Sequence, residues 1–382
     1  MGALDGVTIV EIAAIGPVPF CGMLLSDMGA TVIRIDRTES SDLGLQFDAR
    51  FHIANRGRKS IAVNLKSKEG VETVLALLER ADAVIEGFRP GVMERLGLGP
   101  DVCLARNKKL VYGRMTGWGQ SGPLANVAGH DINYIALTGV LHSVGERGRA
   151  PGVPLNLIGD YGGGALYLCV GMLAGLLEAH RSGQGQVVDA AMVDGSASLM
   201  TLFTGMVAAG VWNEERGTNA IDAGSHFYNV YETADGEFVS IGCIERKFYL
   251  QFLDLIGLSN DKDLVAHQMD KERWPEFVER IAKVMRGKTL AQWCAILQNT
   301  DVCFAPVLRP SEVPNHPHVV ARETFVNHAG VVQPAPAPRF SRTASAIQGP
   351  PVDIGQHTDE ILRGLGLSAD RIASLRKEGT VA

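Results

Sequence analysis

The sequence predicts an α/β protein with a large, Rossmann-like domain built on a parallel sheet and a smaller α+β domain. Strand-like and helix-like segments alternate in the first third of the chain, which favours a parallel sheet. A β-rich texture begins near Phe227 in FYNVYETADGEFVSIGCIE. With 382 residues, of which 46% are apolar and 20% are charged, the chain can bury more than one core.

The spacing of apolar residues defines the first elements. VTIVEI (7–12) and ATVIRID (30–36) each predict a strand, with a helix over about 20–28 between them. A further helix is expected from about Lys68, followed by a strand at AVIEG. This alternation predicts the parallel sheet of the large domain.

The turn after the first strand argues against a dinucleotide cofactor. Asp36 ends the second strand, where Rossmann proteins often carry an acid that binds ribose. The first turn, however, is IGPVP (15–19), which lacks the GxGxxG pattern and the free N–H groups that hold a pyrophosphate. We therefore expect no nicotinamide cofactor.

The later segments divide the chain into domains. Residues 1–190 are expected to form the large domain and residues 225–310 the small one, joined by a linker helix over 191–224 and a return linker over 311–324. The sequence ADG within the β-rich stretch is typical of a hairpin turn. The uncharged run GSASLMTLFTGMVAAGVW from Gly195 predicts a helix buried in a core or a dimer interface. Its small and hydroxyl residues argue against a membrane span.

Charge and cysteine content narrow the classes of function. The net charge of -6 argues against a protein that binds nucleic acid or an anionic membrane, so an anionic ligand must meet a local basic patch. The six cysteines show no CxxC or metal-finger spacing, and MGALDGVTIVEI lacks a basic and apolar leader. We expect a reducing, cytoplasmic location and no metal site.

Basic residues of the first third could form such a patch. Several of them fall near predicted strand ends, where the carboxyl edge of a parallel sheet can meet phosphates. The alternative is a solvated surface with scattered ion pairs. These residues are Arg34, Arg37, Arg56, Arg58, Lys59, Lys66, Arg89 and Arg95.

The stretch AGHDINY (128–134) places a histidine and an aspartate at the start of a predicted helix. His130 would stay a neutral base beside the unsatisfied N–H groups of a helix start, unless it is a buried histidine with a backbone partner. Asp131 is expected to cap the helix, in which Ile132 and Ile135 are expected to be buried. We therefore interpret Asp131 as structural.

Two further acids are candidates for chemistry. Asp160 in GDYGGGAL precedes a long apolar helix and is either a plain N-cap or a reactive carboxyl. The glycines that follow it, 162–164, would let backbone N–H groups face a developing oxyanion. Glu245 in GCIERKFY lies at the end of a predicted strand of the small domain, where an acid is often only solvated.

Seven segments taken together resemble one family. The chain is similar to the α-methylacyl-CoA racemases of the class III CoA-transferase superfamily across nearly its whole length. The resemblance implies an acyl-CoA thioester as substrate and an interlocked homodimer with sites shared between chains. It also implies a large domain built from both termini, completed by about 325–382. The segments are VEIAAIGPVPFCGMLLSDMGATVIRIDR, IEGFRPGVMERLGLGP, YGRMTGWGQSGP, AGHDINYIALTGVL, PLNLIGDYGGG, GQGQVVDAAMVDG and YETADGEFVSIGCIE.

The resemblance also implies roles for individual residues. His130 matches the racemase histidine and Asp160 the racemase aspartate, which are the two general acid/base groups, and Glu245 matches an acid that pairs with the histidine across the subunit boundary. No cofactor is implied, since CoA is part of the substrate. The implied substrate and CoA contacts are Arg37, Val63, Asn64, Leu65, Lys66, Gly87, Phe88, Arg89, Arg95, Gly129, Asp131, Ile132, Asn133 and Tyr134.

The expected reaction is inversion of the α-carbon of 2-methylacyl-CoA thioesters by 1,1-proton transfer through an enolate. The alternative is a class III CoA-transferase with Asp160 as the nucleophile. Those enzymes generally lack the histidine of GHDINY and carry a glycine-run loop, whereas His130 is present and no GGGG occurs here. A non-catalytic acyl-CoA-binding protein is less favoured, because His130, Asp160 and Glu245 are all intact.

Two departures from the family pattern fall in the small domain. Arg246 and Lys247 follow Glu245 where racemases resemble IEPQFY, and DAGSHFY replaces a pattern closer to DGGAPFY. We expect these changes to bring charge and a histidine, His226, to the small-domain face of the pocket. They would then alter the preference for the acyl chain.

Overall fold

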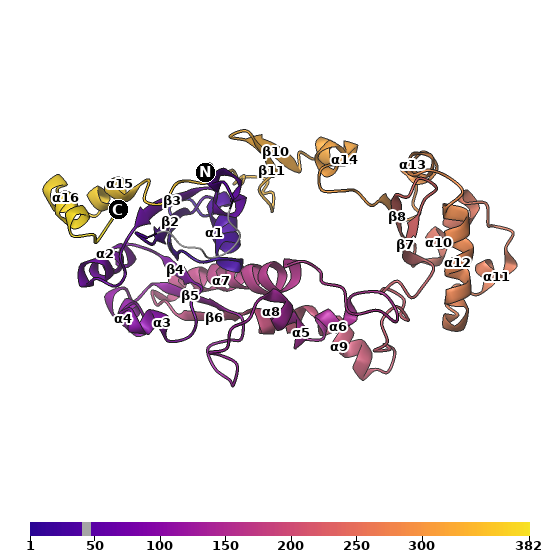
Figure 1. The fold of residues 1–382 in the computed structure, drawn as a ribbon, viewed down its shortest axis with the longest axis horizontal. Coiled ribbons are helices and arrows are strands. Elements are labelled where there is room, and N and C mark those ends of the chain that lie inside the picture. Colours follow the sequence, from indigo (N-terminus) through magenta and orange to yellow (C-terminus); the bar gives the residue numbers. More distant parts are fainter. Residues whose placement is uncertain (40–46) are drawn as a thin grey trace. The chain divides into compact units, whose positions relative to one another are not determined.

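The structure is a computed structural model, and it describes residues 1–39 and 47–382. The described chain divides into two compact units (Figure 1). The large unit comprises Met1–Thr138, Leu155–Leu199 and Ala321–Ala382, and the small unit comprises Gly139–Pro154 and Met200–Val320. Both ends of the chain therefore belong to the large unit.

A six-stranded parallel sheet is the framework of the large unit within the described residues. Its strand order is β3-β2-β1-β4-β5-β6, so the order reverses between β1 and β4. Ligands of such sheets bind beside the carboxyl ends of the strands at this switch point. The predicted α/β class with a parallel sheet is confirmed. The strands are β1 (Thr8–Ile12), β2 (Thr31–Asp36), β3 (Arg58–Ala62), β4 (Ala83–Glu86), β5 (Val111–Thr116) and β6 (Val187–Ala191).

Helices cover both faces of this sheet, which explains the continuous apolar runs of its central strands. Successive residues of a strand point to opposite faces. Val10 packs in a cluster with residues of α2 (Lys68–Leu78), α15 (Thr358–Gly364) and α16 (Ala369–Lys377). Its neighbour Ile9 packs in a second cluster with residues of α1 (Pro17–Asp27) and α7 (Leu166–Ser182). Figure 1 shows α15 beside β3, with α16 next to α15.

Short elements complete the large unit. They are α3 (Val92–Arg95), α4 (Pro100–Arg106), α5 (Asp131–Ala136), a π-helix (Leu157–Ala165), α8 (Met192–Leu199), and the antiparallel pair β10 (Phe325–His328) and β11 (Val331–Pro334). Helix α14 (Pro317–Ala321) stands where the chain returns from the small unit.

The small unit packs helices on an antiparallel sheet of order β7-β8-β9. Its core contains Phe227, Trp274, Phe277 and Trp293. The hairpin predicted around ADG is confirmed, since β7 and β8 pair antiparallel on either side of it. The elements are α6 (Val140–Ser143), α9 (Thr201–Ala208), β7 (Tyr228–Glu232), β8 (Phe238–Gly242), α10 (Arg246–Leu255), α11 (Lys262–Ala266), α12 (Trp274–Met285), α13 (Leu290–Leu297) and β9 (Phe304–Pro306).

The uncharged run from Gly195 forms two helices instead of the one predicted, and its burial in a dimer interface stays a prediction. It forms the end of α8 and a separate helix, α9, and none of the described residues of α9 is buried within the chain. A different stretch, Leu157–Ser182, is long and apolar enough to cross a membrane by length and composition. Helices of protein cores share these properties, and the buried side chains of this stretch, among them Leu168 and Met172, pack in the second cluster of the large unit.

Three of the arginines expected to meet phosphates are instead buried in ion pairs. Arg34 pairs with Asp36 at 2.8 Å, Arg56 with Asp27 at 2.5 Å and Arg58 with Glu11 at 3.0 Å. The Asp36 carboxylate also accepts a hydrogen bond from Ser60 at 2.6 Å, so this acid is satisfied inside the protein. Lys59 pairs with Glu360 at the surface. The remaining four cations of the predicted patch, Arg37, Lys66, Arg89 and Arg95, are exposed.

His226 lies in the core of the small unit, so the prediction that this histidine lies at a face of the pocket is wrong. Its side chain is 0% exposed, and Nε2 lies 2.8 Å from the Tyr249 hydroxyl, which itself donates to the Leu264 carbonyl. Burial lowers the pKa of His226 to about 3. Arg246 and Lys247 are exposed at the start of α10 as expected.

The buried imidazole predicts acid-sensitive stability. Its pKa in the folded chain, about 3, lies below the ordinary value of 6.5, so the unfolded chain takes up a proton first as the pH falls. The contribution of neutral His226 is therefore complete above about pH 6.5 and is lost progressively toward pH 3. Urea unfolding followed by tryptophan fluorescence should show wild type losing on the order of 1.5 kcal/mol more than His226→Gln between pH 6.5 and 5. Parallel pH dependences in the two proteins would contradict this.

Candidate active site

Most of the residues expected to bind CoA follow the carboxyl ends of neighbouring strands. Arg37 comes directly after β2, residues 63–66 come after β3, and residues 87–89 come after β4. Because these strands are parallel, the three segments lie at one edge of the sheet. Exposed cations therefore line the carboxyl edge on both sides of the switch point.

The C-terminus holds the loop after β3. Val63 forms a β-bridge with Val381, and the Asn64 N–H donates to the Thr380 carbonyl at 2.8 Å. The Asn64 side chain then accepts a hydrogen bond from the N–H of Lys66 at 3.0 Å. Val63 is a core residue and Leu65 is half-buried, so Lys66 carries the exposed cation of this loop.

An ionic network whose members are buried except for Glu94 holds the segments of Arg89 and Arg95, and no prediction from the sequence included it. Glu86 at the end of β4 accepts the N–H of Phe88 at 2.7 Å. Arg114 of β5 contacts Glu86 at 3.2 Å and both carboxylate oxygens of Glu94 at 2.7 and 3.2 Å. Burial raises the pKa of Glu86 to about 7. Glu86 and Arg114 occur in the quoted motifs IEGFR and YGRMTG, but only the sheet register makes them neighbours.

His130, and not Asp131, is the N-cap of α5, which corrects the prediction for this helix. The His130 N–H donates to the side chain of Asn133 at 3.0 Å, and the His130 side chain is exposed. Ile135 is buried as expected, whereas Ile132 is 40% exposed.

Tyr134 and Gly129 fix the approach to this helix. The Tyr134 hydroxyl donates to the Gly129 carbonyl, and its ring packs edge-on against Trp118 with centroids 4.8 Å apart. A Cβ atom at Gly129 would lie 2.7 Å from the Tyr134 ring, so glycine is required there. The side chains of Asn133 and Tyr134 therefore hold the helix start that carries His130.

Asp160 lies inside the π-helix and is not an N-cap, because Asn156 occupies that position. The Asp160 carboxylate is half-buried and accepts a hydrogen bond from the Asn156 amide at 3.0 Å. Burial raises the pKa of Asp160; the Asn156 hydrogen bond lowers it, the charge of Asp131 raises it, and His130 lowers it. The net result is a carboxyl that holds its proton more readily than an ordinary aspartate.

The turn after β1 lies against Asp160. Gly16 has a positive φ of 70°, and a Cβ atom there would lie 3.1 Å from the Asp160 carboxylate. A Cβ atom at Gly87, after β4, would lie 2.9 Å from Val18 and 3.2 Å from Ala14. The loops that flank the switch point therefore touch, and Asp160 lies beside one of them. Gly16 had no predicted role beyond the turn.

Two of the three glycines predicted to let backbone approach a ligand, Gly163 and Gly164, pack against a neighbouring helix. A Cβ atom at Gly163 would lie 2.6 Å from the backbone nitrogen of Ser196, and one at Gly164 would lie 2.9 Å from Met192. Both contacts are with α8. Gly163 and Gly164 are therefore buried against this helix.

Asp131 joins the two predicted proton-transfer groups. Its carboxylate accepts the N–H of Asp160 at 2.7 Å, across 29 positions of sequence. His130, its neighbour, is near enough to influence the titration of Asp160. The start of α5 and the π-helix therefore place a histidine and a half-buried aspartic acid together at the cationic edge of the sheet. Such a pair can move protons on an anionic ligand.

Glu245 belongs to the small unit, so its predicted pairing with His130 stays a prediction. It is the exposed N-cap of α10 and makes no capping hydrogen bond. Its charge contributes to a raised pKa of Cys303, although burial is the larger cause, so the two residues are neighbours. Cys303 lines a hollow of about 470 Å³ on the sheet of the small unit, together with Ile221, Ala223, Tyr228, Asn229, Val230, Ser240, Ile241 and Gly242.

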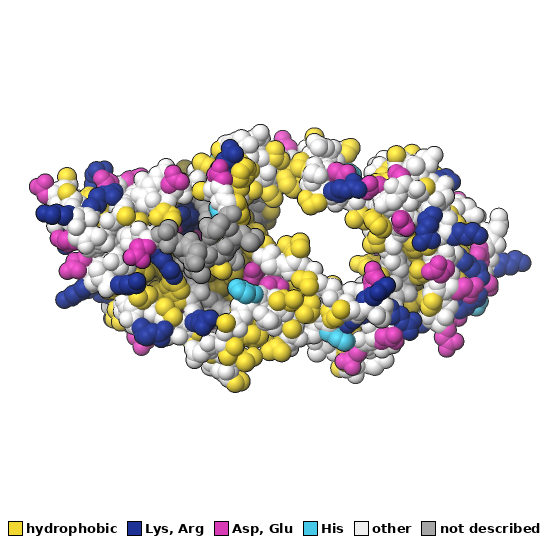
Figure 2. All heavy atoms as spheres, viewed as in Figure 1, with side chains coloured by type: hydrophobic (Ala, Val, Ile, Leu, Met, Phe, Trp, Pro, Cys, Tyr) yellow, Lys and Arg dark blue, Asp and Glu magenta, His cyan; other side chains and the backbone are white. Residues whose placement is uncertain are grey.

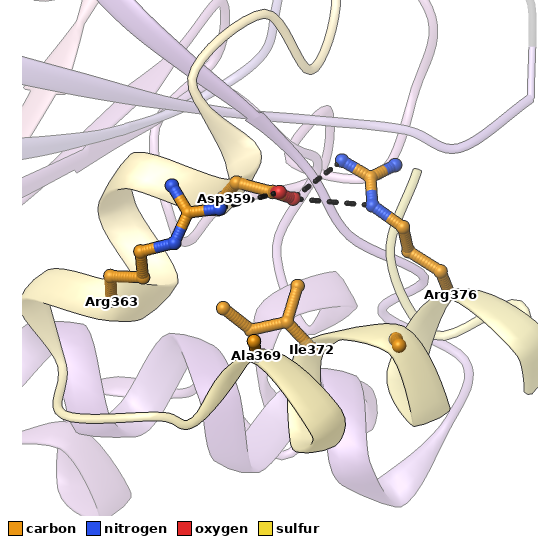
Figure 3. A pocket seen from close by; sticks show the side chains of 6 residues that line it. Asp359, Arg363, Ala369, Ile372 and Arg376 are labelled. Carbon is orange, nitrogen blue, oxygen red and sulfur yellow. Dashed lines mark hydrogen bonds and ion pairs between the residues drawn. The ribbon is translucent and has the colours of Figure 1, made fainter.

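A smaller hollow of about 130 Å³ lies between α15 and α16. Figure 3 shows Asp359 between Arg363 and Arg376, which it contacts at 3.1 and 2.8 Å. This volume is below the usual size of a ligand pocket. The hollow reflects the packing of the helices that hold the loop after β3.

Among the described residues, no group of three or more His, Cys, Asp or Glu side chains is placed to hold a metal ion.

Comparison with known proteins places this geometry in a family. The model of CoA-transferase family III matches residues 4–358. The alpha-methylacyl-CoA racemase of Mus musculus is 44% identical over 382 residues, covering 99% of this chain and 97% of the relative. That of Homo sapiens is 40% identical over 381 residues, covering 98% and 97%.

A solved structure agrees in fold. The crystal structure of a CAIB/BAIF family protein from Brucella suis matches with a TM-score of 0.83 at 25% identity, covering 95% of this chain and 99% of that chain. The family predicted from the seven motifs is therefore confirmed. The chain belongs to CoA-transferase family III and, within it, to the α-methylacyl-CoA racemases.

Proposed function

We propose that the chain is an isomerase that inverts the α-carbon of 2-methylacyl-CoA thioesters by 1,1-proton transfer. The observation that carries the proposal is the juxtaposition of His130 and Asp160 at the switch point of the sheet. Membership of the racemase family supports the same reaction. CoA is part of the substrate, and the proposed chemistry needs no further cofactor.

Racemisation requires the proton beside the thioester to leave one face of the carbon and return to the other. Neutral His130 removes the proton from one epimer while protonated Asp160 delivers a proton to the far face. For the other epimer the roles reverse. The raised pKa of Asp160 supports this role, because the carboxyl must hold a proton in one of the two half-reactions.

The enolate formed between the two transfers needs donors for its oxygen. The first turn of a helix leaves backbone N–H groups without partners inside the helix. In the π-helix the N–H of Asp160 already donates to Asp131, so the remaining N–H groups of that turn are the proposed donors. A donor of this kind is worth roughly 3 to 4 kcal/mol in comparable sites.

The phosphates of CoA would meet the exposed cations of the carboxyl edge. Arg37, Lys66 and Arg89 follow three strands at that edge, and Arg95 lies in α3 just beyond the last of them. A guanidinium group binds phosphate with paired hydrogen bonds. A chain of net charge -6 thereby presents a local positive surface to an anionic substrate.

The active protein is proposed to be a homodimer with shared sites, in which Glu245 of one chain supports His130 of the other. Apolar side chains on α7 support this. Val170 is 66% exposed and Leu177 is 62% exposed, and Leu202 on α9 is 61% exposed. Figure 2 shows hydrophobic side chains gathered over α5 and α8 on the face in view. Large apolar surfaces of this kind mark interaction sites.

Unpaired cysteines fit the proposed cytoplasmic location.

The alternative function is CoA transfer with Asp160 as a nucleophile. A carboxyl whose pKa is raised is more often protonated, and the protonated form is a poor nucleophile. The transferase reaction also gives the neighbouring His130 no necessary role. Both observations favour the racemase over the transferase and over a protein that only binds acyl-CoA.

Deuterium exchange distinguishes these functions. A single epimer of a 2-methylacyl-CoA in deuterium oxide should gain deuterium at the α-carbon and lose stereochemical purity without an added acid. Mass spectrometry and chiral chromatography measure the two changes. Transfer of CoA to an added carboxylic acid, with no exchange, would establish the transferase instead.

Substitution of either acid/base group should slow inversion but leave exchange of the α-proton on one face of the carbon. We expect His130→Ala and Asp160→Ala each to lower kcat for inversion by roughly a hundredfold or more. Each variant should still exchange the α-proton of one epimer, and the two variants should prefer opposite epimers, because one group remains on each face. Exchange of both epimers at wild-type rate in either variant would refute the assignment.

Mixed dimers test the shared site. Chains carrying His130→Ala and chains carrying Glu245→Ala, each with low activity alone, are co-expressed in equal amounts and purified without selection for mixed dimers. A random mixture should recover about a quarter of wild-type activity, because half of the dimers are mixed and each has one intact site of two. If both residues of a site came from one chain, co-expression would recover no activity.

A further inference from the structure

Asp131 is buried beside the site and is only partly satisfied by the protein. Its side chain is 6% exposed, and one oxygen accepts the N–H of Asp160 at 2.7 Å. The other oxygen, Oδ1, has no hydrogen-bond partner among the described residues. A buried carboxylate oxygen without a partner is costly, so its retention needs a physical reason.

We propose that Asp131 is a positioning residue that caps the π-helix from a neighbouring element and holds the carboxyl of Asp160 beside His130. This inference rests on the proposed racemase function and deepens it. It replaces the predicted role of Asp131 as the cap of its own helix. The carboxylate acts on the reaction through Asp160 and not by direct contact with the reacting carbon.

The local backbone explains why an outside cap is needed. The first turn of any helix leaves N–H groups unpaired, and a π-helix leaves one more than an α-helix. Asn156, the N-cap residue, makes no side-chain capping bond and instead donates to the Asp160 carboxylate. Asp131 therefore supplies the acceptor for the backbone while Asn156 orients the side chain. Asp160 is held at both its main chain and its carboxyl.

The approach of Asp131 depends on a glycine. A Cβ atom at Gly159 would lie 2.5 Å from the carboxylate oxygen that accepts the N–H of Asp160. Only a residue without a side chain allows that oxygen to reach the backbone. The first glycine of the GDYGGG segment therefore serves the cap, whereas those at 163 and 164 serve packing against α8.

The charge of Asp131 acts on the same group. Burial is the main cause of the raised pKa of Asp160, Asn156 and His130 lower it, and Asp131 raises it. Burial is the main cause of the raised pKa of the Tyr134 hydroxyl and the charge of Asp160 adds to it, so Tyr134 also lies near Asp160. The turn at Gly16 brings no charge to the carboxyl. Because Oδ1 of Asp131 lacks a donor, its negative charge is not compensated, which helps Asp160 keep its proton.

Two substitutions of Asp131 distinguish its effect on the position of Asp160 from the effect of its negative charge. Asp131→Asn keeps an oxygen that can accept the N–H of Asp160 but removes the charge, and Asp131→Ala removes both. The readout is kcat/KM for both epimers across pH 4 to 9. Asp101→Asn, an exposed acid on α4, is the matched control for the loss of one charge.

We expect Asp131→Asn to move the acid limb of the pH profile to lower pH, because Asp160 then loses its proton more easily. The limb reports the His130 and Asp160 pair, so both epimers should change together. Asp131→Ala should lower kcat/KM on the order of a hundredfold, as expected when a reacting group is displaced. Asp101→Asn should match wild type.

The outcomes are distinct. An acid limb of Asp131→Asn that coincides with wild type would overturn the role of the charge. Wild-type kcat/KM in Asp131→Ala would overturn the positioning role. If Asp131→Ala fails to fold, the isosteric asparagine variant still decides the first point. Absence of racemisation in wild type would instead refute the proposed function, and the inference would fall with it.

Discussion

The carboxyl edge of a parallel sheet, at the point where strand order reverses, is the constraint on which the site depends. Ligands of parallel sheets bind where strand order reverses, as it does here between β1 and β4, and the loops after these strands are in contact through Ala14 and Gly87. Gly16, in the loop after β1, leaves room for the Asp160 carboxylate. The cations after β2, β3 and β4 reach this place because their strands run in the same direction. The groups proposed for proton transfer and for phosphate binding thus share one edge.

Buried ion pairs give this edge its rigidity. They also explain why fewer cations are available to bind a ligand than the sequence suggests. Arg34, Arg56 and Arg58 are the partners of buried acids, and Arg114 joins Glu86 to Glu94. Removing one partner of a buried pair leaves an uncompensated charge, which commonly costs about 3 to 5 kcal/mol. The predicted cations left for a ligand are Arg37, Lys66, Arg89 and Arg95, which are exposed.

The strands and the hairpin that were predicted from strong local sequence patterns occur in the structure. The mistaken predictions about the site concern residues whose surroundings depend on contacts between segments far apart in the sequence. The strands at 7–12 and 30–36 and the ADG hairpin follow from periodicity and turn chemistry. In contrast, an aspartate before glycines predicts an N-cap, and only the contact with Asp131 distinguishes the π-helix from that alternative. His226 likewise looks like a polar pocket residue until the aromatic core around it is known.

The placement of Asp160 shows how one helix start can serve two demands that conflict. A proton carrier must be held firmly, which favours many hydrogen bonds, but hydrogen bonds to the carboxylate favour its ionised form. Here the firm hold comes mainly from the backbone, through an acceptor that is itself negative, while the carboxyl receives one amide donor from Asn156. Rigid placement and a raised pKa are thereby achieved together. A neutral acceptor in place of Asp131 would keep the placement and leave burial, the main cause, to raise the pKa of Asp160 without the added contribution of a negative charge.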